Sequence, residues 1–249
     1  MKRATWIRTL VVIGFVLLLE GLCRWGVIGR MTMIPPSEMA DQLWKLLQSG
    51  RYNGHIFETL GNVAVAFVSA VVGGFVIGSI LHSLPRARRA IDPFLATYYA
   101  IPFFAFYPLL VVIFGLNAAP IILIGFLFGV VAMIINTMNG LDRIPRVLIK
   151  TARVNGLGPL RTAWLIKLPS AAPQLFTGIK LAIAYSFIGV IAAEFIMSTS
   201  GLGYSIAYAF NNFDNRTMYA LMLFIITLVT IVNAFFHVWE RRIMARRGQ

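Results

Sequence analysis

Few side chains in this sequence could carry out covalent or metal chemistry. A single cysteine, Cys23, excludes an intrachain disulfide framework, and cysteine and histidine residues do not occur at metal-ligand spacing. The phosphate-binding pattern GxxxxGK[ST] is absent, so the chain does not bind ATP through that loop. Long apolar segments are instead interrupted by a few ionisable residues, among them the four residues Glu20, Arg24, Lys180 and Glu194. Ionisable residues inside a membrane are costly and are candidates for function by default.

Three of these four residues have a simple structural interpretation. Glu20 and Arg24 are four residues apart, which predicts a pair on one helical face or contact with the outer interface. Lys180 lies near the end of its apolar segment, where its aliphatic stem can reach the headgroups. Glu194 precedes the polar segment 198–203, which we predict to be a flexible turn. We expect Glu194 to gate or pin neighbouring helices rather than to bind solute, because a lone acid would repel an anionic substrate.

The composition requires a lipid environment. Hydrophobic residues make up 59% of the 249 residues, charged residues 12%, and the mean hydropathy is +0.79, which leaves too little polar surface for a soluble domain. The net charge of +13 does not indicate nucleic-acid binding, because the basic residues lie between apolar segments rather than along a stripe. A transmembrane helix needs about 20 apolar residues. Six segments qualify: about 7–28, 56–84, 94–114, 118–138, 173–197 and 217–239.

These spans predict an all-α integral membrane protein with one transmembrane domain, residues 1–249. The N-terminal segment is similar to a signal peptide, but no small-x-small cleavage site follows it, so we interpret it as a retained span. Sixteen basic residues lie at the two termini, at 86–89 and at 143–167, against four in the other connecting segments. The positive-inside rule therefore places both termini and the loop 139–172 in the cytoplasm.

Two further patterns predict how the helices are arranged. Residues 38–48 carry apolar side chains on one helical face, which predicts a short interfacial helix capped by Ser37. Two glycine pairs, Gly74 with Gly78 and Gly125 with Gly129, have helical spacing and allow the second and fourth spans to approach a neighbour closely.

The cytoplasmic loop contains the segment KTARVNGLGPLRTAWLIKLPSAAP, residues 150–173. Arg146, Lys150 and Arg153 share one helical face, and we expect Gly156 to end this helix as a C-terminal cap. Pro159 suits the first turn of a second short helix, while Pro169 and Pro173 are predicted to break the chain before the fifth span. A solvated loop that only fixes topology is the alternative.

The spacing of this loop resembles the signature of ABC importer permeases. Gly156 is followed, after nine residues, by Ile166-Lys167-Leu168-Pro169, as in the pattern EAA, three residues, G, nine residues, I-x-L-P. Four further segments are similar to the sulfonate, nitrate and taurine importer branch: IPPSEMADQL, HIFETLGNVAVAFVSAVVGGFVIG, DPFLATYYAIPFFAFYPLLVVIFG and AAEFIMSTSGLG. One difference is Lys150, which stands where the motif has glutamate, with Thr151 in place of the first alanine.

The resemblance implies a type I importer fold and a set of partners. These are a second permease copy forming a homodimer, two cytoplasmic ABC ATPase subunits that hold ATP and magnesium, and a periplasmic or extracellular solute-binding protein. This chain would carry no cofactor and no catalytic residue, and it would lie in a bacterial inner membrane. By the same resemblance, Ala152 is the small residue that allows close approach. The residues that would dock onto the ATPase are Leu148, Lys150, Thr151, Ala152, Arg153, Asn155, Gly156 and Leu157.

The third span is aromatic and contains two prolines, Pro102 and Pro108, which should kink it beside the pathway. This density of aromatic residues suggests an organic solute, such as an aromatic acid or vitamin precursor, rather than an inorganic anion; sulfonate, nitrate and taurine are the solutes of the similar branch. A proton-coupled carrier would need ionisable relays and often an internal repeat, and a passive channel would give the loop no partner. The candidate pathway and gate residues are Tyr99, Pro102, Phe103, Tyr107, Tyr185, Ser186 and Glu194.

Overall fold

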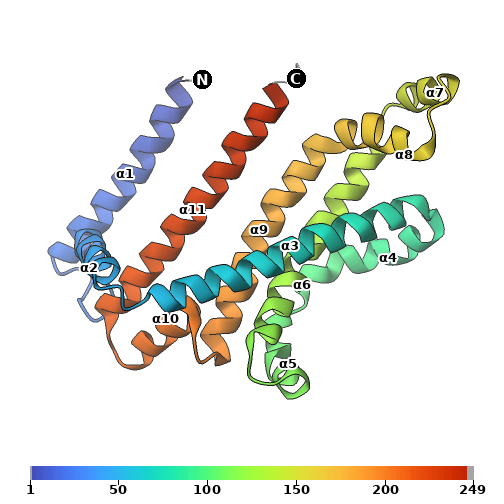
Figure 1. The fold of residues 1–249 in the computed structure, drawn as a ribbon. Coiled ribbons are helices and arrows are strands. Elements are labelled where there is room, and N and C mark those ends of the chain that lie inside the picture. The colour runs from blue at the N-terminus through green and yellow to red at the C-terminus, as the bar shows by residue number, and fades with distance from the viewer. Residues whose placement is uncertain (1, 246–249) are drawn as a thin grey trace.

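The computed structural model describes residues 2–245, and the regular elements among them are all helices (Figure 1). The N-terminal part contains α1 (Lys2–Arg24), α2 (Pro36–Ser49), α3 (Asn53–Ser83) and α4 (Pro85–Thr97). Two 3-10 turns (Tyr98–Ala100 and Phe103–Phe106) lead into α5 (Tyr107–Phe114) and α6 (Ala118–Asp142). The remaining elements are α7 (Arg146–Val154), α8 (Pro159–Thr162), a π-helical turn (Ala163–Lys167), α9 (Leu168–Met197), α10 (Gly201–Asn211) and α11 (Asn215–Ala245).

Four stretches of helix in the described chain are long and apolar enough to cross a membrane: Asn53–Ser83, Ala118–Asp142, Pro159–Ile196 and Asn215–Arg242. A fifth crossing is possible if the bent pair Pro85–Ala100 and Phe103–Phe114 forms one span. The first predicted span, 7–28, falls on α1, whose apolar side chains from Leu10 to Leu18 are largely exposed. The total of six spans stays a prediction.

The third predicted span, 94–114, is not one helix. Its two halves are bent by 85° at Ile101 and Pro102. Proline disfavours helical geometry in the residue before it, and Ile101 accordingly has extended backbone, with φ −81° and ψ 120°. Pro108 causes no break, because it lies in the first turn of α5, where its missing N–H has no partner to lose. The predicted kink is therefore confirmed at Pro102 and wrong at Pro108.

The fifth predicted span begins earlier than expected. The prediction that Pro169 and Pro173 break the chain is wrong, since α8, the π-helical turn and α9 form one continuous helix, Pro159–Ile196. The π-helical turn stands directly before Pro169, and such turns in membrane helices let neighbouring groups take over bonds that proline cannot make. The loop between α6 and this helix is consequently 143–158, shorter than the predicted 139–172.

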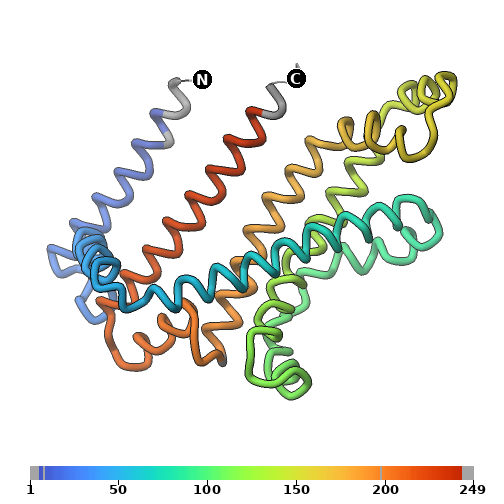
Figure 2. Tube along the Cα trace, in the orientation of Figure 1, coloured from blue at the N-terminus to red at the C-terminus, as the bar shows by residue number. Residues whose placement is uncertain are grey.

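The core of the molecule is the contact between α3, α6 and α9, and Figure 2 shows α3 running obliquely across the other two. The predicted close approach of the glycine pairs is confirmed. A Cβ atom at Gly78 would stand 2.8 Å from the Ile134 carbonyl of α6, and one at Gly125 would stand 2.6 Å from Val190 of α9. Glycine is thus required where these helix backbones almost touch.

The N-terminal end of α1 and the C-terminal end of α11 lie on the same side of the molecule as α7, at the top of Figure 1, whereas α2 lies beside the opposite end of α1 and α10 beside the opposite end of α11. The side chains of Arg246 and Arg247, which contribute to the predicted basic cluster, lie outside the described residues.

Candidate functional site

The helix of the predicted docking loop, α7, has a well-defined end. The Leu157 N–H donates to the Ala152 carbonyl (2.9 Å) and the Gly156 N–H donates to the Arg153 carbonyl (3.0 Å). This pair of bonds is a Schellman motif, which needs a left-handed residue, and Gly156 has φ +66°. The predicted glycine cap is confirmed. It turns the chain sharply from α7 into α8.

The surface of α7 differs from the expected one at Ala152. That residue is 1% exposed, buried within its own chain where α7 packs against the π-helical turn, so its small size permits packing inside the loop. The docking role implied for Ala152, as the small residue that allows close approach, stays a prediction. The other predicted docking residues are exposed or, for Leu157, half-buried: Leu148, Lys150, Thr151, Arg153, Asn155, Gly156 and Leu157.

Two exposed apolar side chains on α7 were not predicted as site residues. Val147 is 69% exposed and Val154 is 87% exposed, on a helix that also carries Arg146, Lys150 and Arg153. Leu160 of α8 is also exposed at 75%. Apolar residues seven apart on a charged helix were the available signal in the sequence. Val147 and Val154 lie on one face of α7 and give this helix an apolar strip flanked by arginine and lysine.

At the other end of the molecule, Glu194 of α9 is completely buried and surrounded by donors. Thr59 donates its hydroxyl to Oε2 (2.8 Å), the Gly203 N–H donates to the same oxygen (3.1 Å), and the Asn62 amide donates to Oε1 (3.4 Å). Thr59 also accepts the Leu202 N–H at 2.8 Å, so its own hydrogen is directed at Glu194. This set of donors suits an ionised carboxylate.

These bonds hold the start of α10, where helical N–H groups have no partner within the helix. His55 Nδ1 accepts from the Gly201 N–H at 3.1 Å, beside the bonds from Leu202 and Gly203. A Cβ atom at Gly201 would lie 2.4 Å from the carboxylate, so glycine is needed there. The prediction of a flexible turn over 198–203 is wrong beyond Ser200, because α10 already begins at Gly201.

The aromatic residues around the bend at Ile101 and Pro102 form a ring cluster. Tyr99 lies 5.1 Å from Tyr185 of α9 between ring centroids, and Tyr98 lies 4.6 Å from Phe103. Tyr99 is 43% exposed, and Pro102 is exposed as well. Phe103, Tyr107 and Ser186 are buried among neighbouring helices in this conformation. Only some of the predicted pathway residues therefore have exposed side chains that a solute could reach.

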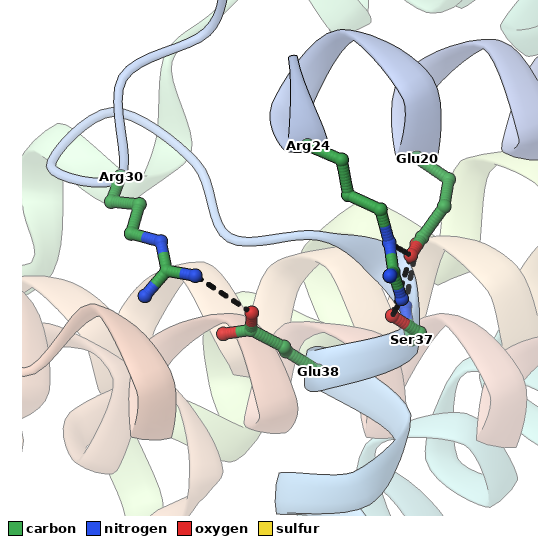
Figure 3. A network of polar contacts seen from close by, with 5 residues as sticks. All are labelled: Glu20, Arg24, Arg30, Ser37 and Glu38. Atoms are coloured by element: carbon green, nitrogen blue, oxygen red, sulfur yellow. Dashed lines mark hydrogen bonds and ion pairs between the residues drawn. The ribbon is translucent and has the colours of Figure 1, made fainter. Parts of the chain in front are cut away.

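The remaining ionisable residues of the apolar segments have partners. Glu20 accepts from Arg24 at 2.6 Å, as predicted, and also from the hydroxyl (2.6 Å) and backbone N–H (2.9 Å) of Ser37 (Figure 3). Ser37 thus ties α2 to α1 and does not cap its own helix, whose first residue is Pro36. Lys180 pairs with Glu240 of α11 at 2.6 Å, where we had expected contact with headgroups. These contacts are structural.

Comparison with known proteins agrees with this architecture. Residues 70–246 match the family described as "Binding-protein-dependent transport system inner membrane component". A probable ABC transporter permease of Brucella melitensis is 26% identical over 90% of this chain and 92% of its own length. The riboflavin transport permease RibX of Chloroflexus aurantiacus is 30% identical over 80% of this chain and 75% of its own. The taurine permease TauC of Escherichia coli is 26% identical over 76% and 72%.

A solved structure shares the fold. The inward-facing MetNI methionine ABC transporter aligns with a TM-score of 0.66 and 20% identity, over 77% of this chain and 95% of that chain. The carrier and channel alternatives are not favoured by these matches. The chain belongs to the family of inner-membrane components of binding-protein-dependent transport systems, and it is a multi-pass permease subunit of an ABC importer, a transport component rather than an enzyme.

Proposed function

We propose that two copies of this chain form the solute pathway, that two ABC ATPase subunits bind α7 from the cytoplasm, and that a solute-binding protein delivers solute at the opposite side. The observation that carries this proposal is the capped α7 with its exposed apolar and basic strip. A surface of this kind suits a groove lined by apolar and acidic residues on a partner.

The continuous helix Pro159–Ile196 supports a mechanical role for the loop. Because α7 packs on the π-helical turn, a displacement of α7 moves the start of a helix that continues to Glu194. Glu194 in turn holds the start of α10. We therefore infer that closure of the ATPase subunits is transmitted along α9 to the outer end, where Glu194 anchors α10 as part of the outer gate.

The pathway residues that are not fully buried favour an organic solute. Tyr99 and Tyr185 form an amphipathic, uncharged pair beside the break at Pro102. An aromatic ring or apolar chain can stack on such a pair, whereas an inorganic anion would require positive charge. Taurine and riboflavin, the solutes named for two relatives, define the range to be tested together with sulfonates and nitrate.

The docking proposal can be tested with Val154→Asp and Ala152→Trp. The first places a charge in the exposed apolar strip, and the second displaces α7 from the π-helical turn. Neither residue lies in a membrane-spanning helix, so we expect normal insertion and detergent stability. We expect loss of ATPase co-purification from native membranes, as well as loss of uptake.

Lys150→Glu is the matched control on the same helix. Because an exposed ion pair contributes only about 0–1 kcal/mol, this variant should retain most of the complex. If Val154→Asp and Ala152→Trp both retained the ATPase and full uptake, the loop would only fix topology and the docking proposal would be wrong.

A further inference from the structure

A group of ionisable side chains joins α3, α4 and α6 beside the docking loop. Arg88 of α4 donates from Nη1 to Asp142 Oδ1 (2.9 Å), and its Nη2 lies 2.7 Å from Oδ2, so the guanidinium and carboxylate form a two-bond fork. His82, at the end of α3, places Nδ1 3.1 Å from the same carboxylate. We call the first contact the Arg88–Asp142 fork.

The Arg88–Asp142 fork lies between the docking loop and the bent third span. Asp142 is the last residue of α6, and α7 begins at Arg146, so the carboxylate is attached to the loop that we propose to bind the ATPase. Arg88 lies in the first half of α4, which leads at its other end into the bend at Ile101 and Pro102. The fork therefore connects the base of the docking loop with the aromatic bend.

The packing of α4 explains why a polar link is needed there. No residue of α4 is buried, and its apolar contact with the core formed by α3 and α6 comes from partly buried side chains, among them Ala87 and Leu95. A helix attached so loosely does not follow its neighbour through apolar packing alone. A bidentate arginine–carboxylate contact fixes both distance and orientation, as a single ammonium contact does not.

We propose that Arg88 and Asp142 are positioning residues that make α4 move together with the docking loop when the ATPase subunits close. The inference rests on the proposed function of that loop. It predicts a second route for the motion, from α7 through the fork into α4 and the bend, in addition to the route along α9. The fork is partly exposed to solvent, with side chains 28% and 39% accessible, so its removal should leave folding intact.

The test measures movement without knowledge of the solute. The complex of permease and ATPase is prepared with Cys23→Ser, and a nitroxide is attached to Ala96→Cys on exposed α4. In a dimer, one label per chain reports a single distance between subunits. That distance is compared between the resting complex and the complex trapped with ATP and vanadate. A second preparation carries the label at Leu160→Cys, on α8 beside the docking loop.

We expect both labels to change distance on trapping in the otherwise native chain. With Asp142→Asn the Leu160 label should still move, whereas the change at Ala96 should fall by at least half. The exchanged pair Arg88→Asp with Asp142→Arg should restore it. This exchange is tolerable because it puts a cation at the end of α6 and an anion near the start of α4, each favourable with the helix dipole.

Glu240→Gln provides a matched control, since Lys180 and Glu240 form an ion pair of similar exposure between α9 and α11. It should leave the movement at Ala96 unchanged. The proposal is overturned if Ala96 moves equally in Asp142→Asn, if it does not move in the native chain, or if the exchanged pair fails to restore it. If the ATPase does not co-purify, or if the Leu160 label is immobile, the proposed docking function has failed instead.

Discussion

At the scale of single residues, Glu194 shows what an ionisable group in an apolar segment can do for structure. Its polarity marked it in the sequence as a gate or pin, but its partners could not be seen there, because Thr59 and Asn62 are 135 and 132 residues away. In the folded chain the carboxylate accepts from three donors and has no exposed surface. Its geometry favours a pin between α3, α9 and α10 over a site for solute.

Replacement of Glu194 should destabilise the permease, and the loss of both carboxylate oxygens should destabilise it more than the loss of one. Glu194→Leu leaves three buried donors without an acceptor, and each such group costs about 1–3 kcal/mol. We expect a clear fall in the thermal unfolding temperature of the purified protein in detergent. Glu194→Gln retains one acceptor oxygen, so its unfolding temperature should fall less.

Glu58→Gln is the comparison for that measurement. Glu58 accepts from Ser200 at the same end of the molecule, but it is exposed, so its replacement should change the unfolding temperature little. Equal unfolding temperatures for Glu194→Leu and Glu58→Gln would contradict the pinning role.

At the scale of elements, glycine patterns were more informative in the sequence than proline patterns. The close helix contacts at Gly78 and Gly125 could be predicted, because only a residue without a side chain fits where two helix backbones come this close. Proline has opposite effects in different settings: Pro102 breaks a helix, Pro108 begins one, and Pro169 and Pro173 lie within a continuous helix. Which effect prevails depends on packing that a local pattern does not contain.

The glycine contacts can be tested with two alanine substitutions of opposite expected effect. In Gly125→Ala the added methyl would stand 2.6 Å from Val190 and 2.9 Å from Ala66, so overpacking should cost about 1–3 kcal/mol. In Gly61→Ala nothing lies within 4 Å, and alanine should stabilise helix α3 by about 1 kcal/mol. Thermal unfolding of the two purified variants measures the difference. An equal change in both would show that the α6–α9 contact is looser than described.

At the scale of the whole molecule, fold class and family could be predicted from the sequence, whereas the number and shape of the spans could not. Apolar length identifies four crossings directly. The third predicted span met the same criterion of length, yet the chain turns through 85° within it, because Pro102 and the aromatic packing around it prevent a straight helix. Hydropathy indicates whether a segment is apolar enough to lie in lipid. It does not indicate whether that segment runs straight or bends.

The orientation in the membrane follows from charge and gives the last prediction. If the bent pair counts as one crossing and α1 as another, the chain crosses six times and we predict both termini to lie with α7 in the cytoplasm. The N-terminal end of α1 and the C-terminal end of α11 lie on the side of α7 in Figure 1, which agrees with this prediction. A fluorescent protein that matures only in the cytoplasm should be bright when fused at Gln249 and dark after Leu46. Alkaline phosphatase, active only outside, should show the reverse pattern. Cytoplasmic signals at both positions would mean that a predicted crossing before α2 is missing. A cytoplasmic signal at Leu46 with an external one at Gln249 would invert the orientation and remove α7 from the side on which an ATPase could reach it.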